Sequence, residues 1–262
     1  MDSSLLRRIT VAAVGLPILL GAVWLGGYYL LALAALVAVL GILELYRLAE
    51  KATGAKPLTQ LGTALALVFI LDAWRGAANT GLLLTLAVTF PLLYLLFRRQ
   101  PNPVSAWAAT VAGALYVGWL LGHALLLRGL ADGHLWLLFA LLVTFATDTS
   151  AYFVGRTIGR HKMAPTISPK KTWEGAFGGV VGAALAALGL DAALSLPLIP
   201  WEALALGAAA AVVAALGDLA ESMLKRSAGA GEASHLLPGH GGILDRLDSV
   251  LFVLPFVYYV VA

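Results

Sequence analysis

The chain has 262 residues, of which 61% are hydrophobic and only 12% are charged, and its formal net charge is +3. Together with a mean hydropathy of +0.91, this composition excludes an ordinary soluble domain and indicates an integral membrane protein. The absence of cysteine excludes a disulfide scaffold, a thiolate zinc site and a cysteine nucleophile.

Apolar runs along the whole chain predict an all-α polytopic membrane protein with about nine transmembrane helices. No linker or low-complexity tract interrupts them, so a single integral membrane domain is expected over residues 1–262. Its N-terminal spans cover roughly 1–130 and its C-terminal catalytic spans and loops roughly 134–262. The expected helices lie near residues 9–27, 28–43, 58–74, 79–97, 104–127, 134–153, 175–195, 201–217 and 242–261.

Basic residues are distributed very unequally between the two sides of such a bundle. If nine helices alternate in direction, all 17 lysines and arginines except Arg75 and Arg128 fall on one side. Cytoplasmic loops carry the excess of basic residues in membrane proteins. The N-terminus and the two long polar loops, 156–175 and 217–248, are therefore predicted to be cytoplasmic.

The last apolar run is too short to cross a membrane unless its helix also includes acidic residues. The run from Val250 to Ala262 gives about 20 Å of helix at ~1.5 Å per residue, against a hydrocarbon thickness of ~30 Å. The helix is therefore expected to begin near Gly242, which places Asp245 and Asp248 on one helical face.

Two other apolar runs are also too short to cross a membrane, so their helices are expected to extend beyond them. The helix over Leu135–Ala146 is expected to reach Asp148, and the helix over Trp201–Leu216 is expected to include Asp218 and Glu221. A carboxylate that faced lipid would cost about 2.5 to 3.5 kcal/mol. These acids are therefore predicted to face a polar cavity inside the bundle that opens toward the cytoplasm.

Ion pairs at the helix ends are an alternative explanation of these charges. Glu221 could pair with Lys225, and Asp245 with Arg246 or Lys225, and such pairs would hold the spans together without any ligand. Simple pairing does not explain the excess of acids beside glycines near the C-terminus. Magnesium prefers one or two carboxylates with water and phosphate oxygens, which favours a metal site for phosphoryl transfer.

The cytoplasmic loop 156–175 carries five cations and is predicted to hold a triphosphate. Ser168 and Pro169 are typical of an N-cap and a first helical position, so Lys170 and Lys171 are expected on the first turn of a helix. Anchoring of these lysines to anionic lipid headgroups, with Trp173 at the interface, is the alternative.

Three segments of the C-terminal half carry a family resemblance: SPKKTWEG at 168–175, GDLAESMLKR at 217–226 and PGHGGILDRLD at 238–248. They are similar to the signatures of phosphatidate cytidylyltransferase, also called CDP-diacylglycerol synthase. The resemblance implies condensation of CTP with phosphatidic acid to CDP-diacylglycerol and pyrophosphate in the cell's inner or plasma membrane. It also implies a need for Mg²⁺, leaves open a second metal or a monovalent cation, and is compatible with a homodimer.

The resemblance also implies roles for individual residues. Asp218, Asp245 and Asp248 are expected to bind the metal, with Lys225 and Arg246 completing the catalytic set. Residues expected at substrate phosphates are Ser168, Lys170, Lys171, Ser222, Arg226 and His240. Asp148, Glu221 and Glu232 are expected to have a secondary role in the same site.

One position departs from the family pattern, because Gly231 precedes Glu232 where the family has a lysine before an acid. Either a nearby cation such as Lys225 or Arg226 supplies the missing contact, or that lysine serves the loop and not the chemistry, or the protein is weakened or altered in its substrate. The first two explanations are favoured. Two other functions stay open: a CTP-dependent lipid kinase of the phytol or dolichol type, and an ion-coupled secondary transporter. Nothing in the sequence indicates a nucleic-acid partner.

Other polar and small residues receive structural expectations only. Glu44, Asp72 and Asp132 are expected at solvated span ends, and His123 is expected to be hydrogen-bonded within the bundle. The two G-x-x-x-G segments at 118–122 and 178–182 are expected to pack helices of the same chain closely together.

Overall fold

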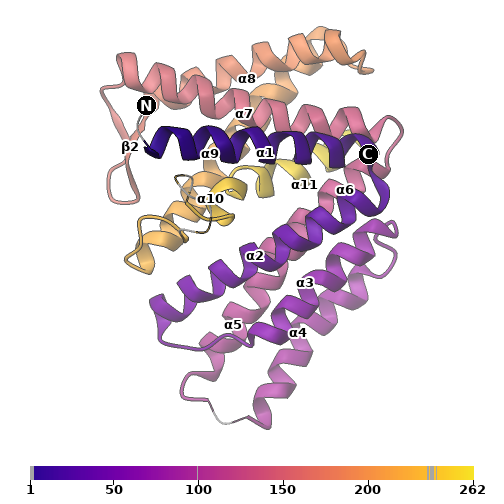
Figure 1. Ribbon diagram of the computed structural model, residues 1–262, viewed down its shortest axis with the longest axis vertical. Coiled ribbons are helices and arrows are strands. Elements are labelled where there is room, and N and C mark those ends of the chain that lie inside the picture. The colour runs from indigo at the N-terminus through magenta and orange to yellow at the C-terminus, as the bar shows by residue number, and fades with distance from the viewer. Residues whose placement is uncertain (1–2, 99, 235, 237–238, 240) are drawn as a thin grey trace. The chain divides into compact units, whose positions relative to one another are not determined.

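The computed structural model describes residues 3–98, 100–234, 236, 239 and 241–262, and it is almost entirely helical (Figure 1). The all-α prediction is confirmed. The helices are α1 (Ser3–Leu25), α2 (Gly27–Thr53), α3 (Thr59–Trp74), α4 (Thr80–Leu96), α5 (Pro103–Gly113), the π-helical η1 (Ala114–Trp119), α6 (Leu120–Gly129), α7 (Gly133–Ile158), α8 (Trp173–Leu194), α9 (Pro200–Ser227), α10 (Leu244–Leu247) and α11 (Val250–Val261). One hairpin, β1 (Lys162–Ala164) and β2 (Ser168–Thr172), joins α7 to α8.

Helices are found at all nine places where apolar runs predict them. Within the part of the chain that the structure describes, five helical stretches are long and apolar enough to cross a membrane: α2, the continuous run from α5 through η1 to α6, α7, α8 and α9. This confirms the membrane character of the chain. The count of nine spans and the cytoplasmic N-terminus remain predictions.

The chain forms two compact units. Unit 1 contains Met1–Gly129 and Leu224–Leu247, and unit 2 contains Leu130–Met223 and Asp248–Ala262. The chain passes between the two units twice near the predicted acidic residues, once inside α9 and once between α10 and α11.

Unit 1 is held together by small residues that let its helices approach closely. A Cβ added at Gly118 would lie 2.5 Å from the backbone Cα of Ala66 on α3, and one at Gly122 would lie 3.0 Å from the Cβ of Ala73. The first G-x-x-x-G segment therefore packs within the chain, as expected. His123 is also buried as expected, with its Nδ1 atom 3.0 Å from the carbonyl oxygen of Trp119.

Asp72 corrects an expectation of solvated placement, because only 6% of this residue is exposed. Its carboxylate accepts hydrogen bonds from the backbone N–H of Asn79 at 3.0 Å and from the hydroxyl of Thr80 at 2.8 Å. These donors belong to the start of α4, where helical N–H groups have no partner within the helix. Asp72 therefore links the end of α3 to the start of α4.

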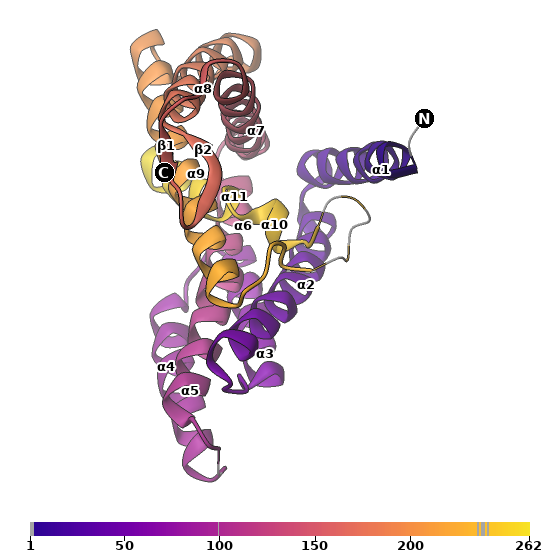
Figure 2. The same ribbon diagram turned by 90° about the vertical axis from the view of Figure 1, so that its left-hand side faces the viewer.

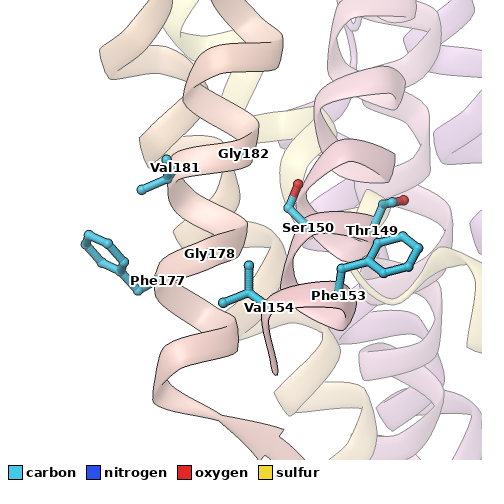
Figure 3. Close-up of a pocket in the computed structure, with 8 residues that line it drawn as sticks. All are labelled: Thr149, Ser150, Phe153, Val154, Phe177, Gly178, Val181 and Gly182. Atoms are coloured by element: carbon cyan, nitrogen blue, oxygen red, sulfur yellow. The ribbon is translucent and has the colours of Figure 1, made fainter. Parts of the chain in front are cut away.

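In unit 2, α7 and α8 lie side by side and the β1–β2 hairpin connects them at one end (Figure 2). A Cβ at Gly178 would lie 2.5 Å from the Cβ of Val154, and one at Gly182 would collide with Ser150. Figure 3 shows these four residues in the shallow groove between the two helices, with Phe153 and Phe177 at its rim. The second G-x-x-x-G segment also packs within the chain.

The structure corrects the predicted start of α8. Ser168 and Pro169 do not begin a helix but lie in β2, which pairs antiparallel with β1. The helix begins at Trp173, and the Thr172 hydroxyl accepts the N–H of Gly175 at 3.2 Å as its N-cap. Lys170 and Lys171 therefore extend from a strand and not from a helical turn, because the segment that carries them pairs with β1.

The predicted continuous last helix is also wrong. It is divided into the single turn α10 and the separate helix α11, with Asp248 and Ser249 between them. The Asp248 carboxylate accepts the N–H of Ser249 at 2.7 Å, and such a local side-chain bond competes with the helical pattern. Asp245 and Asp248 therefore do not share one face of one helix.

Candidate functional site

The first predicted cluster lies in unit 2 and joins β2 to α9. The Lys171 ammonium group lies 2.7 Å from Oδ2 of Asp218, and both side chains stay partly exposed, at 22% and 31%. The Ser222 hydroxyl, one helical turn further along α9, donates to Oδ1 of Asp218 at 3.3 Å. The structure thus brings together three residues that the sequence assigned to the site.

The extension of α9 past its apolar run is confirmed, because the helix continues to Ser227. It carries Asp218, Glu221 and Lys225 along one side, as their spacing predicts. Glu221 is completely buried, in contrast to the partly exposed Asp218. The predicted extension of α7 to Asp148 is also confirmed, although that residue is exposed.

The second cluster lies in unit 1 around Asp245. The Lys225 ammonium group donates to Oδ1 of Asp245 at 2.6 Å, and the two side chains are only 11% and 7% exposed. Oδ2 of the same carboxylate accepts the backbone N–H groups of Ala233 at 2.9 Å and Gly242 at 2.8 Å. One of the two pairings that the ion-pair alternative proposed for Asp245 is therefore present.

The environment of Asp245 favours the ionised carboxylate. Burial acts to raise its pKa, but the hydrogen bonds from Lys225 and from the backbone of Gly242 and Ala233 act against burial. The net effect is a pKa below the ordinary value. The group is therefore a carboxylate at neutral pH, the protonation state that a metal or a lysine requires.

Glu44 of α2 is a member of this region that sequence reasoning assigned to a solvated span end. It is 2% exposed, and its carboxylate accepts the backbone N–H groups of Ile243 at 3.1 Å and Leu244 at 2.8 Å. The Ser234 hydroxyl also donates to it. A sequence signal for burial does exist, because the apolar period of α2 continues past the predicted span through Leu45 and Leu48.

Glu174 is a second contributor that the sequence did not single out. It accepts the backbone N–H groups of Arg160 at 3.1 Å and His161 at 3.2 Å, and its Oε1 lies 2.5 Å from Nδ1 of His161. These contacts fix the chain where it enters the cationic hairpin. Glu174 thus holds the base of the loop that presents Lys170 and Lys171.

The remaining predicted residues are placed separately. Lys170, Arg226, Glu232 and Arg246 are exposed, and Arg226 donates to the carbonyl oxygen of Ala230 at 3.0 Å. Ser168 is partly buried in β2. His240 lies outside the described residues.

Asp248 lies in unit 2, next to the segment of α9 that carries Asp218. A Cβ added at Gly217 would lie 2.6 Å from the carbonyl oxygen of Asp248, so the two backbones are in close contact there. Only glycine permits this approach. The close contact brings the chain segments that bear two of the three predicted metal ligands together within unit 2.

The donor set suits magnesium only with help from substrate oxygens. Within the described residues, no three histidine, aspartate or glutamate side chains gather closely enough to hold a metal ion by themselves. Magnesium, however, is usually bound by one or two carboxylates plus water and phosphate oxygens. A carboxylate has about four lone-pair sites. Asp218 accepts a hydrogen bond from Ser222 and lies 2.7 Å from the Lys171 ammonium group, so it can still take a cation.

Comparison with known proteins covers nearly the whole chain. A model of the cytidylyltransferase family matches residues 6–262. A phosphatidate cytidylyltransferase of Synechocystis sp. is 34% identical over an alignment of 285 positions that covers 97% of this chain and 96% of the relative. One of Staphylococcus epidermidis is 35% identical over 256 residues, with 96% and 95% covered.

A shorter and more similar match is the phosphatidate cytidylyltransferase of Bacillus subtilis, 41% identical over 150 residues, which are 57% of this chain and 56% of the relative. The family match and the two long matches each leave only a few residues of the chain uncovered. The chain belongs to the cytidylyltransferase family.

Proposed function

We propose that this protein is a phosphatidate cytidylyltransferase, a membrane enzyme that condenses CTP with phosphatidic acid to CDP-diacylglycerol and pyrophosphate. The observation that carries the proposal is similarity to proteins of that name over 96–97% of the chain. Both lysine–aspartate ion pairs described above lie within or between the signature segments of the C-terminal half. The site chemistry therefore agrees with the family.

In the proposed reaction, a nonbridging oxygen of the phosphatidate headgroup attacks the α-phosphorus of CTP. A bond forms between that oxygen and the α-phosphorus as the bond to the α,β-bridging oxygen breaks, and pyrophosphate leaves with the electron pair. A phosphate monoester dianion is already a competent nucleophile near neutral pH. The protein therefore supplies mainly positioning and charge neutralisation, without a covalent intermediate.

We assign the two paired lysines to the phosphates of the substrates. Lys171 and Lys225 are each held by an aspartate, so their ammonium groups are oriented before substrate arrives. The exposed Lys170, Arg226 and Arg246 add cations that can reach a phosphate in solvent.

Asp218, Asp245 and Asp248 are assigned to Mg²⁺, which when bound neutralises charge on the triphosphate. Asp218 and Asp245 each keep acceptor capacity beyond the contacts described above. Whether one metal or a second cation is used follows from the number of binding events in a magnesium titration.

We further propose that the site faces the cytoplasm from the inner or plasma membrane, and that the enzyme forms a homodimer. The distribution of basic residues supports this orientation. CTP would then arrive from water, while phosphatidic acid would enter laterally with its acyl chains still in the bilayer. Accessibility labelling of a cysteine introduced at Lys170 tests the orientation, because the native chain has no cysteine.

The test of the function uses purified protein in mixed micelles with phosphatidic acid, magnesium and CTP labelled in the cytidine. We expect label to enter the lipid with one pyrophosphate released per label, and Asp245→Asn to abolish both. Asp132→Asn is the matched control, since Asp132 is exposed and its φ of 52° suits asparagine. Transfer of the γ-phosphate with release of CDP would establish a lipid kinase instead, and no consumption of CTP would favour a transporter.

A further inference from the structure

We propose that Glu44 is a positioning residue for the reaction. From α2, in the N-terminal half of the sequence, it fixes the backbone turn that carries Asp245 and Arg246. The inference rests on the proposed function and adds to it a residue outside the C-terminal signature segments. All of the groups involved belong to unit 1.

The contacts of Glu44 are directed at the start of α10. Oε1 accepts the N–H of Ile243 at 3.1 Å, and Oε2 accepts the N–H of Leu244 at 2.8 Å. N–H groups at a helix start have no partner within the helix, so an acidic acceptor stabilises them. With 2% of Glu44 exposed, water does not compete for these bonds.

Gly242 lies directly against the Glu44 carboxylate, and Gly41 of α2 is in ordinary contact with the same turn. A Cβ added at Gly242 would lie 2.5 Å from Oε2 of Glu44 and 2.8 Å from its Cδ. On α2, a Cβ at Gly41 would lie 3.7 Å from Leu247 and 3.9 Å from Ile243. The carboxylate therefore packs against the backbone of the turn itself.

The same two backbone segments orient Asp245. Its Oδ2 accepts the N–H of Gly242, which directly precedes the residues held by Glu44, and the N–H of Ala233, which directly precedes Ser234. The Ser234 hydroxyl is in turn bonded to Glu44. Glu44 thus fixes both chain segments that determine the position of the Asp245 carboxylate.

The carboxylate is required, and an amide does not replace it. Glutamine at this position has one carbonyl oxygen for the hydroxyl and two backbone donors, and its NH₂ group would face an N–H group. We therefore expect Glu44→Gln to loosen the turn while preserving side-chain volume. Misplacement of a catalytic group by about 1 Å costs on the order of a hundredfold in rate.

The first measurement is steady-state kinetics per mole of folded protein. We expect Glu44→Gln to lower kcat at least tenfold while KM for CTP stays within threefold, because Lys171 is held by Asp218 and not by Asp245. Glu44→Asp, which keeps the charge, is expected to recover part of kcat. Glu50→Gln on the same helix is the matched control, since Glu50 is exposed, and it is expected to behave as the wild type.

The second measurement is hydrogen exchange of the peptide covering residues 241–247, which does not depend on any activity. We expect exchange at least tenfold faster in Glu44→Gln than in Glu50→Gln. Unchanged exchange, or a kcat within twofold of the wild type, would overturn the positioning role. Absence of cytidylyl transfer in the wild type would instead refute the proposed function, and the exchange result would still decide whether Glu44 holds the turn.

Discussion

Lys225→Met is the perturbation that most directly measures the Asp245 cluster. The substitution removes the ammonium group 2.6 Å from Oδ1 and leaves a carboxylate with only 7% of its side chain exposed. Removing one partner of a buried ion pair costs about 3–5 kcal/mol. Since Asp245 retains the N–H groups of Gly242 and Ala233, we expect the lower end, about 3 kcal/mol of unfolding free energy.

The pairwise part of that cost is obtained by adding Asp245→Asn and the double variant Lys225→Met/Asp245→Asn. If the ion pair is intact in the wild type, the double variant is less destabilised than the sum of the singles. We expect a coupling energy of about 2 kcal/mol, within the ~0.5–3 kcal/mol range of residues in contact. Reversible unfolding by sodium dodecyl sulfate in mixed micelles measures it, with the 7 tryptophans as the fluorescence probe.

The lowered pKa of Asp245 predicts how the coupling energy depends on pH. Its folded-state pKa lies below the ordinary value, so its contribution to stability is present above the ordinary pKa of 3.8 and is lost as the pH falls through the folded value. The coupling energy should therefore be constant from pH 8 to about 5 and decline in stronger acid. A coupling below about 0.5 kcal/mol at pH 7, the value of an exposed pair, would refute the reasoning.

Three further predictions test packing and substrate contacts. Gly118→Ala places a methyl group 2.5 Å from a backbone atom of α3 and should destabilise by about 1–3 kcal/mol, whereas Gly81→Ala, with nothing within 4 Å, should be neutral or stabilising in the same unfolding assay. Lys171→Gln should lower kcat/KM for CTP about 10- to 100-fold through loss of a charged phosphate contact; an equal loss in Lys162→Gln, on the same hairpin, would mean that general hairpin charge is responsible. Gly231→Lys meets no neighbouring atom, and we expect its kcat/KM for CTP to stay within twofold of the wild type; a larger gain would show that Lys225 and Arg226 do not supply the missing contact.

Periodicity and apolar length locate the helices of this protein well. The extension of α9 to Asp218 and Glu221 follows from the length that a membrane crossing needs. The start of α8 does not, because Ser168 followed by Pro169 fits both an N-cap and a strand. The pairing with β1 decides between them, and this pairing is a tertiary contact.

The site is predictable where its chemistry is local and not where it depends on distant partners. Lys225 and Asp245 stand in neighbouring signature segments, so their acid and base character already indicates pairing. Glu44 is different, because the apolar period of α2 indicates that it is buried but not which groups its carboxylate contacts. Its partners Ile243 and Leu244 lie 199 and 200 residues away, a separation that no pattern within α2 reveals.

That separation has a consequence for biogenesis. The compact unit built from the first 129 residues also contains Leu224–Leu247, so it is incomplete until almost all of the chain has left the ribosome. Until then Glu44 lacks the N–H groups that satisfy it, within a helix apolar enough to enter the bilayer. Contacts between such distant segments form slowly because a long loop must close first. An interrupted chain would therefore keep a carboxylate in α2 without the backbone N–H groups of Ile243 and Leu244 that satisfy it in the folded protein.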